Sequence, residues 1–241
     1  MKFLLTTLSV LVLFAATIAQ AETVRFQASD GVTITAEYNA PDAGFETAIV
    51  LFHMAGSSRG EYTDIAQRLN DLGYATLAVD QRSGGQFRGV ANETVAAAGG
   101  STSFVAAIPD LVAASTWARE NAGASRVGVL GSSYSAGLVL VLSAQDQGFA
   151  DAVMSFSPGE YYGARNFVAR EVGDIQVPVF LTSARSEVGQ WESFARGIRS
   201  TVVGFVPEGS GRHGASVLDS GDAAEYWAAL EGFLGENLPV N

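Results

Sequence analysis

Three serines stand within four positions in the stretch VGVLGSSYSAGL, residues 127–138. The apolar residues before the serines predict a buried strand, and those after them predict a helix. A serine at a sharp turn between strand and helix can act as the nucleophile in acyl transfer, if the residues two before and two after it are small. Ser132 fails this condition because a leucine and a tyrosine stand there, whereas Ser133 and Ser135 both meet it.

The position along the chain favours Ser133 over Ser135 as the nucleophile. The predicted strand 126–130 has to end, turn once and start the helix at once, and Ser133 stands at that turn. Ser135 would lie half a turn into the helix, where it is better suited as a small neighbour of the turn. The alternative is that these serines only cap a helix that begins near Tyr134.

A serine nucleophile needs a general base, and histidine is suited to that task near neutral pH. The chain has two histidines, His53 and His213. His213 lies in a glycine-rich loop after the last predicted strand, from which it could reach the turn that carries the serine. His53 also ends a strand but stands beside the segment MAGSS, where it is better placed to shape an oxyanion-binding turn. We therefore predict His213 as the base.

The third member of such a site is a carboxylate that orients the histidine without taking its proton. Glu187 follows the predicted strand 178–182 directly, at the same edge of the sheet as the serine. Glu192, in the following helix, and Glu208, close to the histidine loop, remain alternatives. We predict Glu187.

Backbone N–H groups are expected to stabilise the oxyanion that forms in the reaction. One would belong to Tyr134, directly after the nucleophile, and the other to Met54, in the loop after His53. His53, Arg82 and Ser135 are candidates for lining the substrate pocket.

The rest of the chain predicts the elements that position these residues. Alternating apolar residues flank Asp30-Gly31, which is a strong hairpin signal. The predicted strands that follow are 47–52, 75–79, 126–130, 152–156, 178–182 and 201–206, and the predicted helices are 61–72, 108–121, 136–143, 190–198 and 223–234. Near-continuous apolar strands that alternate with helices predict a parallel sheet covered on both faces. Asp80, at a strand end, is expected to be a structural hydrogen-bonding centre.

Two connections differ in length. The segment 81–107 is long, rich in glycine, alanine and serine, and without clear periodicity, as is typical of a functional loop. The segment 159–176 is short and leaves no room for a large lid domain. We find no internal repeat and no linker, so residues 22–241 are predicted to form a single domain.

The first 21 residues have the three-part pattern of a secretory signal peptide. A positive start is followed by an apolar run and by Ala19-Gln20-Ala21, a cleavage signature. The alternative, an uncleaved membrane anchor, is disfavoured because the apolar run is short for a bilayer. The sequence therefore predicts export to the periplasm or the medium, with no stable membrane association after cleavage. The chain has no cysteine, which excludes disulfides.

Composition restricts the partners. The 241 residues are 48% hydrophobic, which excludes a disordered or fibrous protein. The net charge of −11 argues against nucleic acid and against an anionic membrane surface. Two histidines and no cysteine argue against a zinc site. The chemistry predicted for the serine and the histidine needs no metal and no organic cofactor, so neither is expected.

These motifs resemble the α/β-hydrolases, and in particular the group of dienelactone hydrolase and small bacterial serine esterases. The resemblance rests on the segments FHMAGSS, LGYATLAVDQR, GSSYSAG and VPVFLTSARSE and on the late His-Gly pair. It implies an α/β-hydrolase fold, with a mostly parallel central sheet, an N-terminal antiparallel hairpin, helices on both faces and no large lid domain. The order Ser133, Glu187, His213 is the order in the family.

The sequence departs from the family pattern at several positions, and these departures bear on which activity the resemblance implies. His53-Met54 stands where His-Gly is usual, Ser135 where glycine is commoner, and the acid is a glutamate rather than an aspartate. Dienelactone hydrolase itself uses a cysteine, which this chain lacks. We therefore predict a serine hydrolase that acts on small-molecule carboxylic esters or lactones through a Ser-His-Glu triad and an acyl-enzyme. A peptidase on the same fold, or a binding protein that retains the fold without catalysis, are the alternatives.

Overall fold

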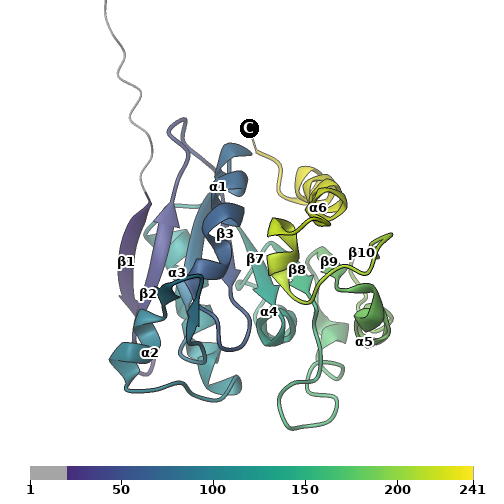
Figure 1. Cartoon of the computed structure of the whole chain (residues 1–241), viewed down its shortest axis with the longest axis horizontal. Helices are drawn as coiled ribbons and strands as arrows, with labels where there is room; N and C mark the ends of the chain where they lie inside the picture. The colour runs from purple at the N-terminus through teal and green to yellow at the C-terminus, as the bar shows by residue number, and fades with distance from the viewer. Residues whose placement is uncertain (1–20, 241) are drawn as a thin grey trace, which may run out of the picture.

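A computed structural model describes residues 21–240 of the chain. The predicted signal peptide therefore lies, apart from Ala21, outside the described residues. Figure 1 shows a twisted sheet with helices packed on both of its faces. Within residues 21–240, no helix is both long and apolar enough to cross a membrane.

One sheet of eight strands forms the centre of the described chain, in the order β1-β2-β4-β3-β7-β8-β9-β10. The strands are β1 (Glu22–Gln27), β2 (Thr33–Asn39), β3 (Thr47–Phe52), β4 (Ala75–Asp80), β7 (Arg126–Ser132), β8 (Ala152–Phe156), β9 (Val179–Thr182) and β10 (Val202–Phe205). β1 and β2 form an antiparallel hairpin, and β2 also runs antiparallel to β4. All the other neighbouring pairs are parallel. The predicted fold class is confirmed.

Six α-helices of the described chain cover the sheet. They are α1 (Thr63–Asp71), α2 (Glu93–Ala98), α3 (Ile108–Glu120), α4 (Tyr134–Gln145), α5 (Val188–Ala195) and α6 (Ala223–Asn237). Apolar residues of α3, α4 and α5 pack in one core, and those of α1 and α6 pack in a second core on the opposite face. α4 is buried on nearly all sides, which explains why its sequence is apolar all round.

The connection 81–107 differs from the expectation of an irregular loop. It contains a small hairpin of β5 (Gln86–Phe87) and β6 (Val90–Ala91), followed by α2. The side chain of Asn92 caps α2 by accepting a hydrogen bond from the N–H of Val95 at 2.8 Å. Elements this short give no periodicity over the length of sequence that a pattern needs, so the sequence did not predict them.

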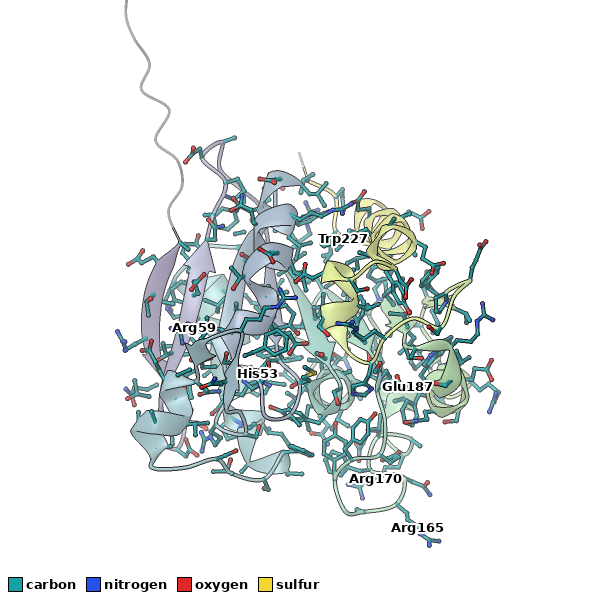
Figure 2. All side chains as sticks on the ribbon, in the orientation of Figure 1. His53, Arg59, Arg165, Arg170, Glu187 and Trp227 are labelled. Carbon is teal, nitrogen blue, oxygen red and sulfur yellow. The ribbon has the colours of Figure 1, made fainter. Side chains whose placement is uncertain are left out.

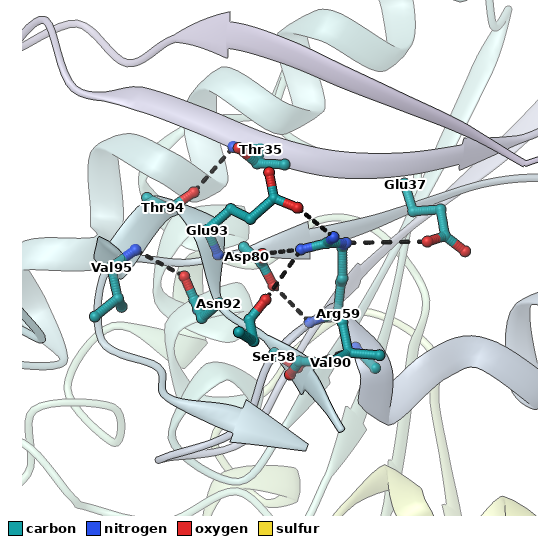
Figure 3. A network of polar contacts seen from close by, with 12 residues as sticks. Thr35, Glu37, Ser58, Arg59, Asp80, Val90, Asn92, Glu93, Thr94 and Val95 are labelled. Atoms are coloured by element: carbon teal, nitrogen blue, oxygen red, sulfur yellow. Dashed lines mark hydrogen bonds and ion pairs between the residues drawn. The ribbon is translucent and has the colours of Figure 1, made fainter. Parts of the chain in front are cut away.

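Asp80 anchors this connection to the sheet, as Figure 3 shows. Its buried carboxylate accepts hydrogen bonds from the backbone N–H groups of Arg59 at 2.7 Å and of Glu93 at 2.8 Å. The Arg59 guanidinium contacts the same carboxylate and donates to Glu93 Oε1 at 2.7 Å. The predicted structural role of Asp80 is confirmed, and this network fixes the start of the connection that borders the site.

Parallel strands end at a common edge of the sheet, and that edge collects the candidate residues. Ser133 follows β7, Ser157 follows β8, Glu187 follows β9 and His213 follows β10. A ligand site at the carboxyl ends of the strands is the expected location in an open parallel sheet.

Candidate active site

Ser133 occupies a strained turn between β7 and α4. Its backbone has φ 59° and ψ −119°, a conformation that costs a residue with a side chain on the order of 1–3 kcal/mol. A Cβ atom at Gly131 would lie 2.5 Å from the carbonyl oxygen of Ser135, so the turn requires glycine two residues before the serine. The Ser133 N–H donates to the carbonyl of Phe156 at 2.8 Å, which attaches the turn to the end of β8.

A continuous chain of hydrogen bonds joins the three predicted side chains. Ser133 Oγ lies 2.8 Å from His213 Nε2, and His213 Nδ1 lies 2.6 Å from Glu187 Oε1. With the proton of the imidazole on Nδ1, the ring donates to the carboxylate and accepts from the serine hydroxyl. Glu187 belongs to the 3₁₀ turn η4 (Arg185–Glu187), between β9 and α5. The structure thus brings Ser133, His213 and Glu187 together from three separate strand ends.

The alternative carboxylates lie elsewhere. Glu192 is exposed on α5, and Glu208 is exposed in the loop after β10. Neither carboxylate forms a hydrogen bond or an ion pair with His213 in the described part of the chain. Glu187 is therefore the carboxylate that orients the imidazole in this structure.

Ser157 supports the acid and was not found by the sequence analysis. Its hydroxyl donates to Glu187 Oε2 at 2.7 Å and accepts from the N–H of Gly214 at 2.9 Å. One side chain thus links the carboxylate to the loop that carries His213. Its backbone has φ 57°, which is unusual for a residue other than glycine. A polar residue directly after the predicted strand 152–156, next to the strand of the nucleophile, was the available signal.

We expect that removing the Ser157 hydroxyl lowers kcat about 10- to 100-fold, because a hydrogen bond to a charged group contributes about 1.5–3 kcal/mol. Ser157→Ala and Ser157→Gly should lose this activity equally, since both lack the hydroxyl. The Gly variant should melt at the higher temperature of the two, because glycine tolerates the positive φ. Ester hydrolysis and thermal unfolding measure these effects.

The matched control is Ser143→Ala. Ser143 is buried in α4, and its hydroxyl has no hydrogen-bond partner in the described structure. This variant should keep kcat within about twofold. Unchanged kcat in both Ser157 variants would show that the hydroxyl does not support Glu187 during turnover.

The first predicted oxyanion donor is free. Tyr134 is the first residue of α4, and its N–H has no acceptor among residues 21–240. The first N–H groups of a helix lack partners within the helix and carry a partial positive charge. This N–H can therefore bind a developing negative charge next to Ser133.

The second predicted donor, Met54, has to be corrected. Its N–H donates to Glu61 Oε2 at 2.8 Å and is not free to bind an oxyanion. The next residue, Ala55, is exposed, and its N–H has no acceptor within the described structure. The Met54 assignment fails because the side chain that occupies its N–H comes from seven residues further along the chain.

The buried side chain of Glu61 connects the loops that surround Ser133. Ser132 Oγ donates to Glu61 Oε1 at 2.7 Å and accepts from the N–H of Ala215 at 2.9 Å. The carboxyl of Glu61 is fully buried, and this burial raises its pKa. Glu61 thereby connects three segments: the turn at Met54, the end of β7 and the loop that carries His213.

With this geometry in view, the comparisons with known proteins identify the family. The model of the S33 serine aminopeptidase family of hydrolases matches residues 45–174, which is more than half of the chain. The chain belongs to this α/β-hydrolase family. A search of curated protein sequences finds no match.

Solved structures share the fold of this hydrolase. An esterase from Pyrococcus furiosus is 20% identical with a TM-score of 0.72, and the match covers 90% of this chain and 93% of the esterase. A dienelactone hydrolase from Anabaena variabilis is 20% identical with a TM-score of 0.66, over 89% of this chain and 95% of that one. Dipeptidyl peptidase 4 from Porphyromonas gingivalis is 15% identical with a TM-score of 0.67, over 91% of this chain and 36% of the peptidase. The predicted resemblance to the α/β-hydrolases is confirmed.

Two of the predicted pocket residues are instead structural residues of the hydrolase. His53 and Ser135 are fully buried. His53 Nδ1 donates to the carbonyl of Met54 at 2.8 Å, and its Nε2 accepts from the N–H of Gln81 at 3.1 Å. Ser135 Oγ donates to the carbonyl of His53 at 2.7 Å. The expectation that they line the pocket is wrong, because both side chains are used to hold the oxyanion turn against the sheet.

The environment of His53 also excludes it as the base. Burial lowers the pKa of its imidazole, and the two ring contacts require the neutral form. Figure 2 labels His53 and Glu187 well apart from each other, with Glu187 towards α5. His53 thus shapes the turn, as the sequence analysis favoured.

Arg82 does not line a pocket either. Its side chain is buried and donates to both Asp30, at the hairpin turn, and Asp110, in α3. These carboxylates occupy the guanidinium, so it is not available to a substrate. The partners are 52 and 28 residues away in the sequence, which is why the arginine alone gave no sign of them.

Residues 21–240 contain no group of three or more His, Asp or Glu side chains that could hold a metal ion.

Proposed function

We propose that the protein is an exported serine hydrolase that cleaves carboxylic esters or lactones. The observation that carries this proposal is the hydrogen-bonded chain from Ser133 through His213 to Glu187, with Ser133 on a strained turn. A nucleophile, a base and a group that orients the base, each within hydrogen-bond distance, are the requirements for nucleophilic catalysis. Export rests on the signal-peptide pattern of residues 1–21.

The proposed reaction starts with attack of Ser133 Oγ on the ester carbonyl while His213 Nε2 takes the hydroxyl proton. Glu187 stabilises the imidazolium that forms. The N–H groups of Tyr134 and Ala55 bind the oxyanion of the tetrahedral intermediate. His213 then gives the proton to the leaving alcohol oxygen, and the acyl group stays on Ser133. Water, activated by His213, releases the acid and restores the serine.

A peptidase is the second candidate, because the matching family model is that of serine aminopeptidases. An aminopeptidase has to bind a free, positively charged amino terminus close to the nucleophile. The cleft next to Tyr134, the residue after Ser133, is lined by Thr102, Ser103, Phe104, Val105, Tyr161 and Tyr162, none of which is charged. A cleft without a carboxylate favours a neutral ester over a cationic peptide terminus.

The test is covalent labelling with a fluorophosphonate, which reacts with activated serines. We expect one adduct per chain, located on Ser133 by tandem mass spectrometry, and no adduct after the protein has been unfolded. An adduct on Ser135 would contradict the assignment of the nucleophile. A folded protein that is not labelled would be a binding protein that retains the hydrolase fold.

A further inference from the structure

A cleft of about 400 Å³ lies between the two connections that border the site. Thr102, Ser103, Phe104 and Val105 come from the connection 81–107, and Tyr161 and Tyr162 come from the loop between β8 and β9. Figure 1 shows that loop below the sheet, beyond the strand ends, and Figure 2 labels Arg165 at its tip.

One wall of the cleft rests on the residue after the nucleophile. The ring of Phe104 stacks on the ring of Tyr134, with 4.3 Å between the centroids and an angle of 15°. The hydroxyl of Tyr162 donates to the carbonyl oxygen of Tyr134. The cleft is therefore attached to the first turn of α4, the turn that directly follows Ser133.

The other wall reaches the acid. The hydroxyl of Tyr161 donates to the carbonyl oxygen of Ser157 at 3.1 Å, and the Ser157 hydroxyl in turn contacts Glu187. A group in the cleft would thus lie between two tyrosines. Tyr161 contacts Ser157, which supports Glu187, and Tyr162 contacts Tyr134, the residue after Ser133. On the proposed function, one substituent of an ester bound at Ser133 would extend into this cleft.

The chemistry of the lining restricts that substituent. Three aromatic residues, one valine, one threonine and one serine form the surface, and no side chain in it carries a charge. Arg82, at the start of the connection 81–107, is neutralised by Asp30 and Asp110. A substrate carboxylate would therefore find no cation in the cleft, whereas an aromatic ring would find rings to stack on.

We propose that this cleft binds the uncharged aryl group of an ester, so that the substrates are neutral arylalkanoyl esters rather than esters or lactones that carry a carboxylate. This inference rests on the proposed function and names the substrate class of the same site. Pockets of this size, apolar with a few hydroxyls, are typical of small-molecule sites.

Methyl esters test the proposal, because their alcohol is too small to occupy the cleft. We expect kcat/KM to be at least tenfold higher for methyl 3-phenylpropanoate than for methyl butanoate, and lower for monomethyl succinate than for either. Hydrolysis is followed by proton release. A wild-type enzyme that prefers monomethyl succinate, or that does not distinguish the two neutral esters, would overturn the proposal.

Val105 provides the variants, since it is 39% exposed and lines the cleft. Val105→Trp should fill the cleft and lower the ratio of kcat/KM for the phenylpropanoate to kcat/KM for methyl butanoate about tenfold. Val105→Arg should raise kcat/KM for monomethyl succinate. The control is Val240→Trp at a similarly exposed valine, 41%, near the C-terminal end. Equal losses on both neutral esters in Val105→Trp would contradict the proposal.

Binding separates a failure of the cleft from a failure of the proposed function. Neutral 3-phenylpropanamide is titrated into Ser133→Ala by calorimetry, with and without Val105→Trp. Binding that Val105→Trp abolishes supports the cleft even if no ester is hydrolysed, and in that case the proposed catalysis has failed. Absence of binding in Ser133→Ala, with esters hydrolysed by the wild type, overturns the cleft alone.

Discussion

Replacing Ser133 by alanine is expected to lower kcat for a short-chain nitrophenyl ester on the order of 10⁴-fold or more. The acyl-enzyme cannot form without Oγ, and what remains is the catalysis by bound water and backbone N–H groups. Far-UV circular dichroism and the melting temperature should stay close to those of the wild type. Among residues 21–240, the Ser133 side chain forms no hydrogen bond other than its contact with His213.

Ser135→Ala is the matched control for this prediction, two residues further along the chain. The Ser135 hydroxyl is buried and contacts the carbonyl of His53 and the side-chain amide of Gln81 at 2.6 Å. Its loss should cost stability, about 1–3 kcal/mol for the unpaired groups left behind, and less than about tenfold in kcat. Equal losses of kcat in the two variants, or a larger loss in Ser135→Ala, would move the nucleophile to Ser135.

The order of the strands is what made the fold predictable. Strands such as 47–52 and 152–156 are short, continuously apolar and bounded by polar turns, so their limits agree with β3 and β8. Helix ends were less well defined. α4 begins at Tyr134 rather than Ala136, because the turn at Ser133 leads into the helix without any intervening residue.

The candidate site was predictable to the extent that it depends on strand ends. Ser133, Glu187 and His213 each follow a parallel strand, and parallel strands bring their ends to one edge. Whether a polar residue faces a substrate or the interior depends on partners far away in the sequence. Arg82 and Met54 look free in the sequence, but Asp110 and Glu61 occupy them in the fold.

Ser157 is the reverse case, because it looks like an ordinary turn residue in the sequence but supports the acid in the fold. Its position directly after a strand is one that ordinary turn serines share, yet it contacts the acid and the histidine loop together. A role of this kind arises only when β8 and β9 are neighbours and the loop after β10 folds back over them. The residues that support a catalytic group are thus harder to predict than the group itself, because their own chemistry is ordinary.

Replacing Glu187 by glutamine is expected to lower kcat on the order of 10⁴-fold, although the side chain keeps its shape. The amide can turn an N–H towards His213 Nδ1, which then accepts and leaves the imidazole proton on Nε2. In that tautomer Nε2 faces Ser133 Oγ with a proton and cannot take a second one from the hydroxyl. The measurement is kcat on the nitrophenyl ester over a range of pH.

Glu187→Asp separates the charge from the position of the carboxylate. Aspartate keeps the negative charge but is shorter by one carbon–carbon bond, so it cannot keep both the 2.6 Å contact with His213 and the 2.7 Å contact with Ser157. The tautomer stays correct and only the alignment suffers, so a loss of about 10- to 100-fold is expected. Glu192→Gln and Glu208→Gln, at exposed carboxylates, should leave kcat unchanged. If either matched the loss in Glu187→Gln, the acid would be another residue, and the contact between Glu187 and His213 would be only structural.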